Sequence, residues 1–223
     1  MISEIVLTLV LGSSPATQRS AQPLVSATGT AYFSCTTWTG KAWTAPTGRS
    51  ARTPIMVSPK GFRAYAEVKV VASDGSCENT TTIYVASRAG RKFKAIYSKT
   101  GGGNGIRLIG WSPTGEKLLA EVNTWEYETD TGYTHIPVLY DASTDSAKEI
   151  LELNQALLRH FGTNCDFDDS LRSWRNGEQV LVKISRPTED DSYEQHFCVE
   201  HSSLFVFDLR DKSLHLYERP QTK

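Results

Sequence analysis

Acidic side chains gather in two polar stretches of the chain, and their type and spacing could do chemistry. These carboxylates are Glu126, Glu128, Asp130, Glu189 and Asp190. Two carboxylates that face each other across a cleft can act as general acid and as base or nucleophile. A carboxylate-dependent hydrolase or lyase acting on carbohydrate or peptide is therefore one functional alternative.

Aromatic residues lie in or beside the same two stretches. They are Trp125, Tyr127, Tyr133 and Tyr193. Exposed rings near carboxylates can stack on sugars or anchor a protein partner, whereas rings that cover sheet edges are structural. Both interpretations stay open at the level of sequence, and the four rings are our candidate binding residues.

Motifs of catalytic, metal or cofactor sites are absent from the sequence, which has no G-x-S-x-G, H-E-x-x-H, P-loop or dinucleotide fingerprint. Asp166, Asp168 and Asp169 could bind calcium, but they lack a glycine-punctuated ligand pattern, so we expect a solvated acidic loop. The odd separation of His196 and His201 in a strand would place them on opposite faces, which disfavours a shared metal. We assign no catalytic residue and expect neither metal nor cofactor.

The chain has four cysteines, none of them in a C-x-x-C pair or at metal-ligand spacing. They are Cys35, Cys77, Cys165 and Cys198. Three pairings are open, of which Cys35 with Cys77 and Cys165 with Cys198 is the most local. Two disulfides would indicate an oxidising compartment, whereas four free thiols would indicate the cytosol.

The N-terminal 22 residues contain an apolar run from Ile5 to Leu11. The run is too short to span a bilayer but would serve as the apolar region of a secretory signal. Because Ile, Val and Thr dominate and Glu4 stands where a signal carries basic residues, an N-terminal strand is the alternative. With the even number of cysteines, we expect a periplasmic or secreted protein, and otherwise a cytoplasmic one.

Length and charge narrow the class further. A chain of 223 residues with 39% hydrophobic residues can bury one good core. With a net charge of -1, the protein has no overall electrostatic attraction to nucleic acid or anionic lipid. We therefore expect neither a nucleic-acid partner nor a membrane span.

An internal repeat shows which elements must position these side chains. VSPKGFRAYAEV, WSPTGEKLLAEV and SWRNGEQVLVKI align without a gap around Gly61, Gly115 and Gly177, which lie 54 and 62 residues apart. Each copy continues with two more apolar runs, so each predicts a four-stranded antiparallel sheet that must stack on its neighbours. The repeats span about 54–98, 106–153 and 171–218.

The turn W-S-P-T-G at 111–115 resembles the W-S-P-D-G turn of the WD40-like repeats in TolB-type β-propellers. The match is good at 57–61 and degenerate at 173–177, and none of the three has the usual Asp before the glycine. The resemblance covers Pro54 to about Tyr217 and implies three propeller-like blades in a non-catalytic binding or scaffolding module outside the cytoplasm. Three blades are fewer than a closed ring uses, so we expect an incomplete or small propeller, or a homo-oligomer that completes the stack.

Two further segments flank or interrupt the repeat domain, which spans 54–223. Residues 23–53 contain Thr30 to Trp38 and Lys41 to Ala45, whose alternation predicts a hairpin. Between the second and third repeats, near-helical spacing of apolar residues before Gly162 predicts one short helix over Leu151 to Phe161.

The longest polar segments follow the second strand of each repeat and therefore share one side of the stack. They are Ala72 to Thr80, Trp125 to His135 and Pro187 to His196. Loops longer than a tight turn cost closure entropy without adding to the core. We therefore expect a recognition surface for a protein or glycan, with the hydrolase or lyase as the alternative.

Overall fold

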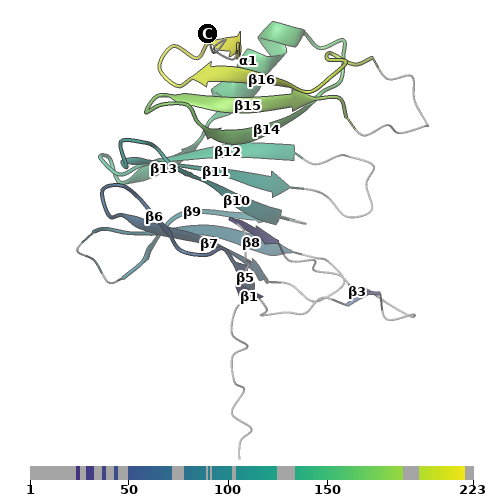
Figure 1. Cartoon of the computed structure of the whole chain (residues 1–223). Coiled ribbons are helices and arrows are strands. Elements are labelled where there is room, and N and C mark those ends of the chain that lie inside the picture. Colours follow the sequence, from purple (N-terminus) through teal and green to yellow (C-terminus); the bar gives the residue numbers. More distant parts are fainter. Residues whose placement is uncertain are drawn as a thin grey trace, which may run out of the picture.

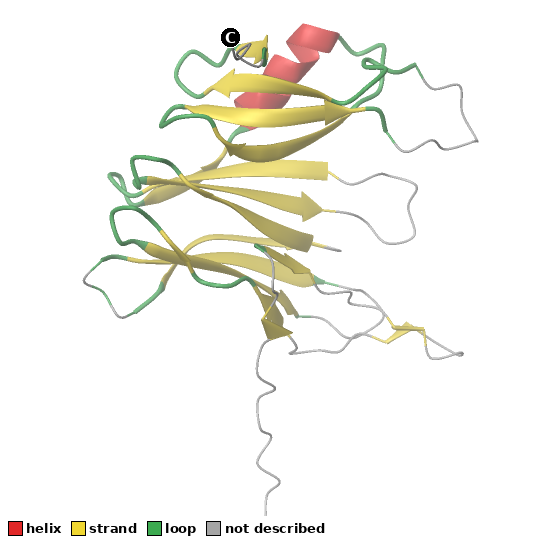
Figure 2. Ribbon diagram, viewed as in Figure 1, coloured by secondary structure: helices red, strands yellow, loops and turns green. Residues whose placement is uncertain are grey.

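The computed structural model describes residues 24–25, 29–32, 37–38, 43–44, 50–71, 78–88, 90, 92–101, 104–124, 134–187 and 196–218. Over these residues the chain is all-β apart from one short helix (Figure 2). Three sheets lie one above another in chain order (Figure 1). The predicted fold class, with three four-stranded units and one helix, is confirmed. No helix among the described residues is long and apolar enough to cross a membrane.

The sheets share one plan, in which four consecutive strands form an antiparallel meander. The first contains β6 (Met56–Val57), β7 (Arg63–Val70), β8 (Asn79–Ala86) and β9 (Lys94–Gly101), extended by β5 (Ser50–Arg52) and β1 (Leu24–Val25). The second contains β10 (Asn104–Trp111), β11 (Lys117–Thr124), β12 (Thr134–Asp141) and β13 (Ser146–Glu149). The third contains β14 (Asp168–Trp174), β15 (Gln179–Ser185), β16 (Ser203–Asp208) and β17 (Leu214–Leu216).

The segment before the repeats is divided between two places, and the expected hairpin is only partly formed. β2 (Thr30–Tyr32) pairs with β10 at the edge of the second sheet. β3 (Thr37–Trp38) pairs with β4 (Trp43–Thr44) in a separate two-stranded ribbon. β2 thus belongs to the stack of three sheets.

The turns of the first two copies differ by one residue. Gly61 and Gly115 both adopt positive φ, 86° and 76°. In the first turn the N–H of Ser58 donates to the carbonyl of Phe62, whereas in the second the N–H of Ser112 donates to that of Lys117. The gapless alignment of the first copy is therefore wrong by one residue beyond its glycine.

This single residue reverses which side chains of the first sheet face its neighbour, because side chains alternate along a strand. Ala64 and Ala66 on β7 are fully buried in the core shared with the second sheet. Arg63, Tyr65 and Glu67 alternate with them on the opposite, outer face. A polar outer face suits the end of a stack.

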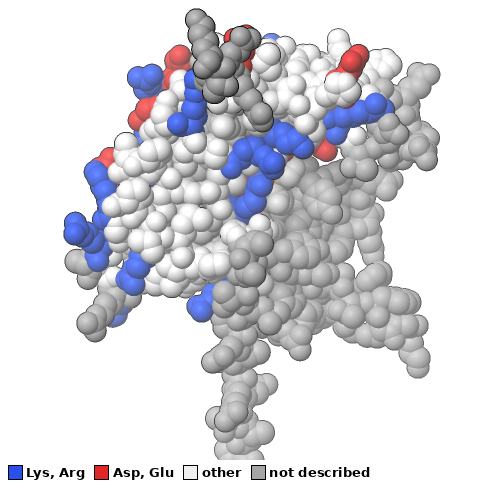
Figure 3. Space-filling model, in the orientation of Figure 1, with Lys and Arg blue, Asp and Glu red and all other residues white. Residues whose placement is uncertain are grey.

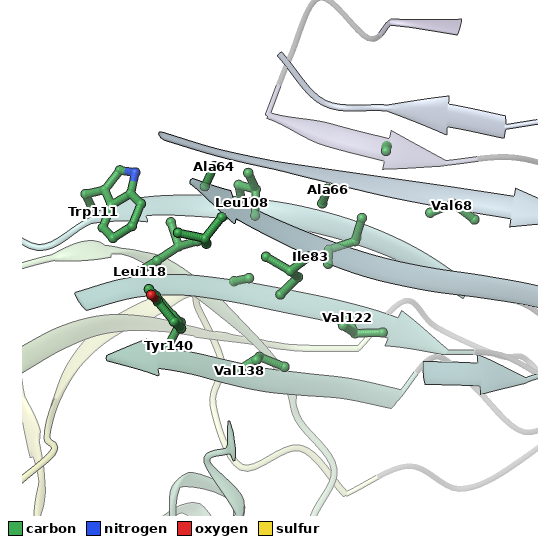
Figure 4. Packing of buried hydrophobic residues seen from close by; sticks show 14 residues of the cluster. Ala64, Ala66, Val68, Ile83, Leu108, Trp111, Leu118, Val122, Val138 and Tyr140 are labelled. Carbon is green, nitrogen blue, oxygen red and sulfur yellow. The ribbon is translucent and has the colours of Figure 1, made fainter. Parts of the chain in front are cut away.

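Two hydrophobic cores lie on the two sides of the second sheet. Figure 4 shows the first, where Ala64, Val68 and Ile83 lie against Leu118 and Val122. The second joins Leu119, Leu139, Val182 and Phe207 to helix α1 (Leu151–Phe161). Both cores consist mainly of buried apolar side chains. Burial of this apolar surface is the main contribution to the stability of the fold.

Helix α1 matches the predicted range and buries one of its faces. Leu153, Ala156 and Leu157 are buried, whereas Leu151 and Leu158 are 58% and 49% exposed. The helix contacts β12 of the second sheet and β17, the edge strand of the third sheet, so it bridges the two sheets.

Neighbouring sheets are linked along the end that carries the turns, hereafter the turn end. The indole N–H of Trp111 lies 3.4 Å from the carbonyl oxygen of Met56, and that of Trp174 donates to Gly110 at 2.8 Å. Lys60 forms an ion pair with Glu116 of the next turn. At the left of Figure 3, which is the turn end, basic and acidic side chains both occur.

Gly115→Ala is expected to lower the free energy of unfolding by about 2 kcal/mol, because an added Cβ combines backbone strain with a steric clash. The residue has positive φ, and a Cβ there would lie 2.8 Å from the backbone nitrogen of Lys60. Gly177→Ala is the matched control, since its Cβ would meet only the Thr114 methyl at 3.1 Å. Chemical denaturation measures both, and an equal loss in the two variants would contradict the stacked-turn geometry.

Candidate functional site

The aromatic candidates Trp125, Tyr127, Tyr133 and Tyr193 lie outside the described residues. The same holds for the carboxylates Glu126, Glu128, Asp130, Glu189 and Asp190, for Cys35 and Cys77, and for residues 1–22. The strands that carry these loops are described, and β11 and β15 both end on the side opposite the turns (Figure 1). This side is called the loop end below.

A polar cluster lies between the second and third sheets toward the loop end. It consists of Arg107, Glu121, Asn123, His135 and Asp169, called the loop-end cluster below. Glu121 and Asn123 alternate with buried residues on β11, and their cross-strand partners are Arg107 on β10 and His135 on β12. Asp169 comes from β14 of the third sheet. Strand pairing within the second sheet and stacking of the third thus bring together residues far apart in sequence.

Glu121 and Arg107 hold the main chain of Leu171 in the third sheet. Arg107 Nη2 donates to Glu121 Oε1 at 2.8 Å and to the Leu171 carbonyl at 2.7 Å. The N–H of Leu171 donates to Glu121 Oε2 at 2.7 Å. The Glu121 side chain is only 3% exposed. Because charged hydrogen bonds in a buried setting are strong, this arrangement fastens the two sheets together.

His135 completes the cluster on the second sheet. Its Nδ1 lies 2.8 Å from Asn123 Oδ1 and 3.6 Å from Glu121 Oε1. The contact with Glu121 raises the pKa of His135 above its ordinary value; burial opposes this rise, and the charges of Asp169 and Asp168 add to it. The imidazole is therefore biased toward its charged form.

The two carboxylates of the cluster have opposite pKa shifts. Burial raises the pKa of Glu121, but the contact with His135, the charge of Arg107 and the Leu171 N–H together lower it below its ordinary value. Burial raises the pKa of Asp169 to about 6; the charge of His135 opposes this shift, and the charge of Glu121 adds to it. One carboxylate thus stays ionised while the other titrates near neutral pH.

The expected solvated acidic loop is only partly observed. Asp166 and Asp168 are exposed, but Asp168 and Asp169 begin strand β14 and Asp169 is half-buried. Among the described residues, no group of three or more His, Cys, Asp or Glu side chains is arranged to hold a metal ion. His196 and His201 are both exposed.

Cys165 and Cys198 form a disulfide, with their Cα atoms 5.0 Å apart. It joins the segment that leads into β14 to the segment that leads into β16. Main-chain hydrogen bonds reinforce the contact, since the Asp166 N–H donates to His196 and the Cys198 N–H to Asp166. The third sheet is thereby closed at the loop end by a covalent bond.

Comparison with known proteins gives little similarity. No family model matches the sequence, and no curated protein matches it. A solved structure that it resembles is "Pyrococcus horikoshii acylaminoacyl peptidase (orthorhombic crystal form)", with 15% sequence identity and a TM-score of 0.47. The match covers 77% of this chain and 25% of that one, so the chain spans about a quarter of its length. At this similarity the match bears on neither activity nor substrate.

Proposed function

We propose that the chain is a non-catalytic binding module that recognises a protein or glycan through its loop-end hairpins. The observation that carries the proposal is the fastening of the second and third sheets by Glu121, Arg107 and the main chain of Leu171. The two joined sheets end their strands β11 and β15 on the same side, so the segments that follow begin at fixed points. A scaffold that fixes where binding segments begin lowers the entropy cost of binding.

The environment of Glu121 favours a structural role for it over a catalytic one. Glu121 accepts hydrogen bonds on both of its oxygens and is 3% exposed. A carboxylate with both oxygens occupied and almost no access cannot take a proton from a substrate, because a general base must reach that proton directly or through one water. Glu121 therefore joins the second sheet to the third and does not act as a general base.

We further propose that the chain is a WD40-like propeller segment of the TolB type that functions in the periplasm or outside the cell. The repeated Ser-Pro-x-Gly turns at Gly61 and Gly115 support the family, since their positive φ values match a shared turn. The polar outer face of β7 supports the first sheet as one end of the stack. The bond between Cys165 and Cys198 supports export, because disulfides persist in oxidising compartments.

Alanine substitution of the loop rings tests the binding function. Partners are first identified by co-purification from the native host and mass spectrometry, and their affinity is then measured with purified protein. Replacing a central anchor among Trp125, Tyr127, Tyr133 and Tyr193 should cost at least ~1–2 kcal/mol of binding with little change in melting temperature. Tyr84→Ala, on the outer face of the first sheet, is the control. Undiminished binding by all four variants would refute the proposal, as would loss of the fold in each of them.

A further inference from the structure

A cavity of about 370 Å³ lies between the second and third sheets at the turn end, away from the loop-end cluster. Its apolar lining includes Leu139, Ile150 and Leu209. Its basic lining consists of Lys117, Lys148 and Lys212, which come from β11, β13 and the turn between β16 and β17. The volume lies within the range of small-molecule sites.

The contact between the second and third sheets differs from the contact between the first and second. Between the first and second sheets, the corresponding space is closed by Lys94 with Asp145 at 2.6 Å and by Tyr97 with Glu149 at 2.8 Å. Between the second and third sheets, helix α1 contacts both β12 and β17, and its Leu157 is buried in the second core. The inserted helix thus joins the second and third sheets, whereas the first and second sheets are joined by their outer strands β9 and β13.

The acidic groups in the cavity wall already have partners. Glu178 accepts hydrogen bonds from Lys117 Nζ on both oxygens, at 2.7 and 2.8 Å. Asp141 accepts from the N–H and the hydroxyl of Ser143, at 2.8 and 2.6 Å. Glu178 is therefore paired with Lys117, whereas Asp141 keeps its negative charge and is held in place by Ser143.

Two of the lysines retain capacity for a ligand. Lys148 is exposed and forms neither an ion pair nor a side-chain hydrogen bond within the described part of the chain. Lys212 donates to the Leu209 carbonyl and lies 3.9 Å from Glu152, a long ion pair that leaves two of its three donors available. The hydroxyls of Thr144 and Ser146 also line the wall. Amines and hydroxyls beside an apolar floor match a ligand with an anionic head and an apolar body.

We propose that this turn-end cavity binds a small organic anion, with its carboxylate or phosphate group at Lys148 and Lys212 and its apolar part against Leu139, Ile150 and Leu209. This site is independent of partner recognition at the loop end. The donors that Lys148 and Lys212 retain favour a negatively charged head group, and the apolar floor favours a ligand that also has an apolar body.

Isothermal titration of the full chain with hexyl phosphate, hexanoate, hexanol and inorganic phosphate tests the proposal. At least one of the two amphiphilic anions should bind at least tenfold more tightly than hexanol and inorganic phosphate, and its affinity should fall with added salt. Which anion binds more tightly distinguishes a phosphate from a carboxylate ligand. Equal affinity for hexyl phosphate, hexanoate and hexanol, or binding of neither anion, would overturn the proposal.

Substitution of the lysines locates the binding. Lys148→Gln and Lys212→Gln should each weaken the tighter anion at least fivefold, and Lys148 is exposed, so its variant should keep the fold. Lys69→Gln is the matched control, because Lys69 is an exposed lysine on the outer face of the first sheet. If both cavity variants bind the anion as the wild type does, the cavity is not the site.

Discussion

Glu121→Ala should lower the free energy of unfolding by about 3–5 kcal/mol, the range for removing one partner of a buried ion pair. Arg107 would lose its carboxylate partner, and the N–H of Leu171 would lose its acceptor at 2.7 Å. The contacts join the second sheet to the third, so the loss should also loosen the third sheet. Urea denaturation measures the change in free energy, and hydrogen exchange of β14 measures the loosening.

A double-mutant cycle separates the ion pair from the loss of packing. Arg107→Ala combined with Glu121→Ala should cost less than the sum of the single changes, because the second removal leaves no unpaired charge. Glu67→Ala is the control: Glu67 aligns with Glu121 in the ungapped repeats but lies on the outer face of the first sheet. Glu67→Ala should lower the free energy of unfolding by less than about 0.5 kcal/mol, as for other surface positions. Equal losses for Glu67→Ala and Glu121→Ala would contradict the role assigned to the cluster.

The strands and the helix could be predicted from the sequence because their signals are local. The apolar run that follows Gly115 and the near-helical spacing before Gly162 each depend on neighbouring residues, and a strand and a helix form there. The ungapped repeat could not show which side chains of the first sheet pack against the second sheet. One residue less in the turn at Gly61 leaves the sequence similarity intact but exchanges the two faces of β7.

The loop-end cluster was missed for a different reason, since its contacts are distant in sequence. Glu121 interrupts the apolar pattern of its strand, and a charged residue at an inward position is the one local signal for a buried pair. Its partner Leu171 comes from another repeat, and the covering of Asp169 depends on the stacking of the third sheet on the second. Sequence periodicity describes each sheet but not the distance between two sheets. The covered Asp169 therefore resembled a solvated loop residue.

Asp169→Asn is expected to stabilise the protein by about 2–3 kcal/mol at pH 7 and above, and to have little effect below pH 4. The folded-state pKa of Asp169 is raised from its ordinary value of 3.8 to about 6, so the folded protein binds this proton more tightly than the unfolded chain. Stability from this group is thus fully present below pH 3.8 and is lost as pH rises toward 6 and above. Asparagine carries no charge at any pH and avoids that loss.

Urea denaturation from pH 4 to pH 8 measures the difference in unfolding free energy between variant and wild type. The raised pKa of His135 also makes stability fall as pH rises through its folded value, but His135 is present in both proteins, so most of its contribution cancels. Asp168→Asn is the matched control, because Asp168 is exposed on the same strand; it should change stability by well under about 1 kcal/mol. A difference for Asp169→Asn that stays constant with pH would show that Asp169 is solvated and that the second and third sheets do not enclose it. A difference that grows between pH 4 and pH 6 would place a titrating carboxylate between the two sheets that carry the loops.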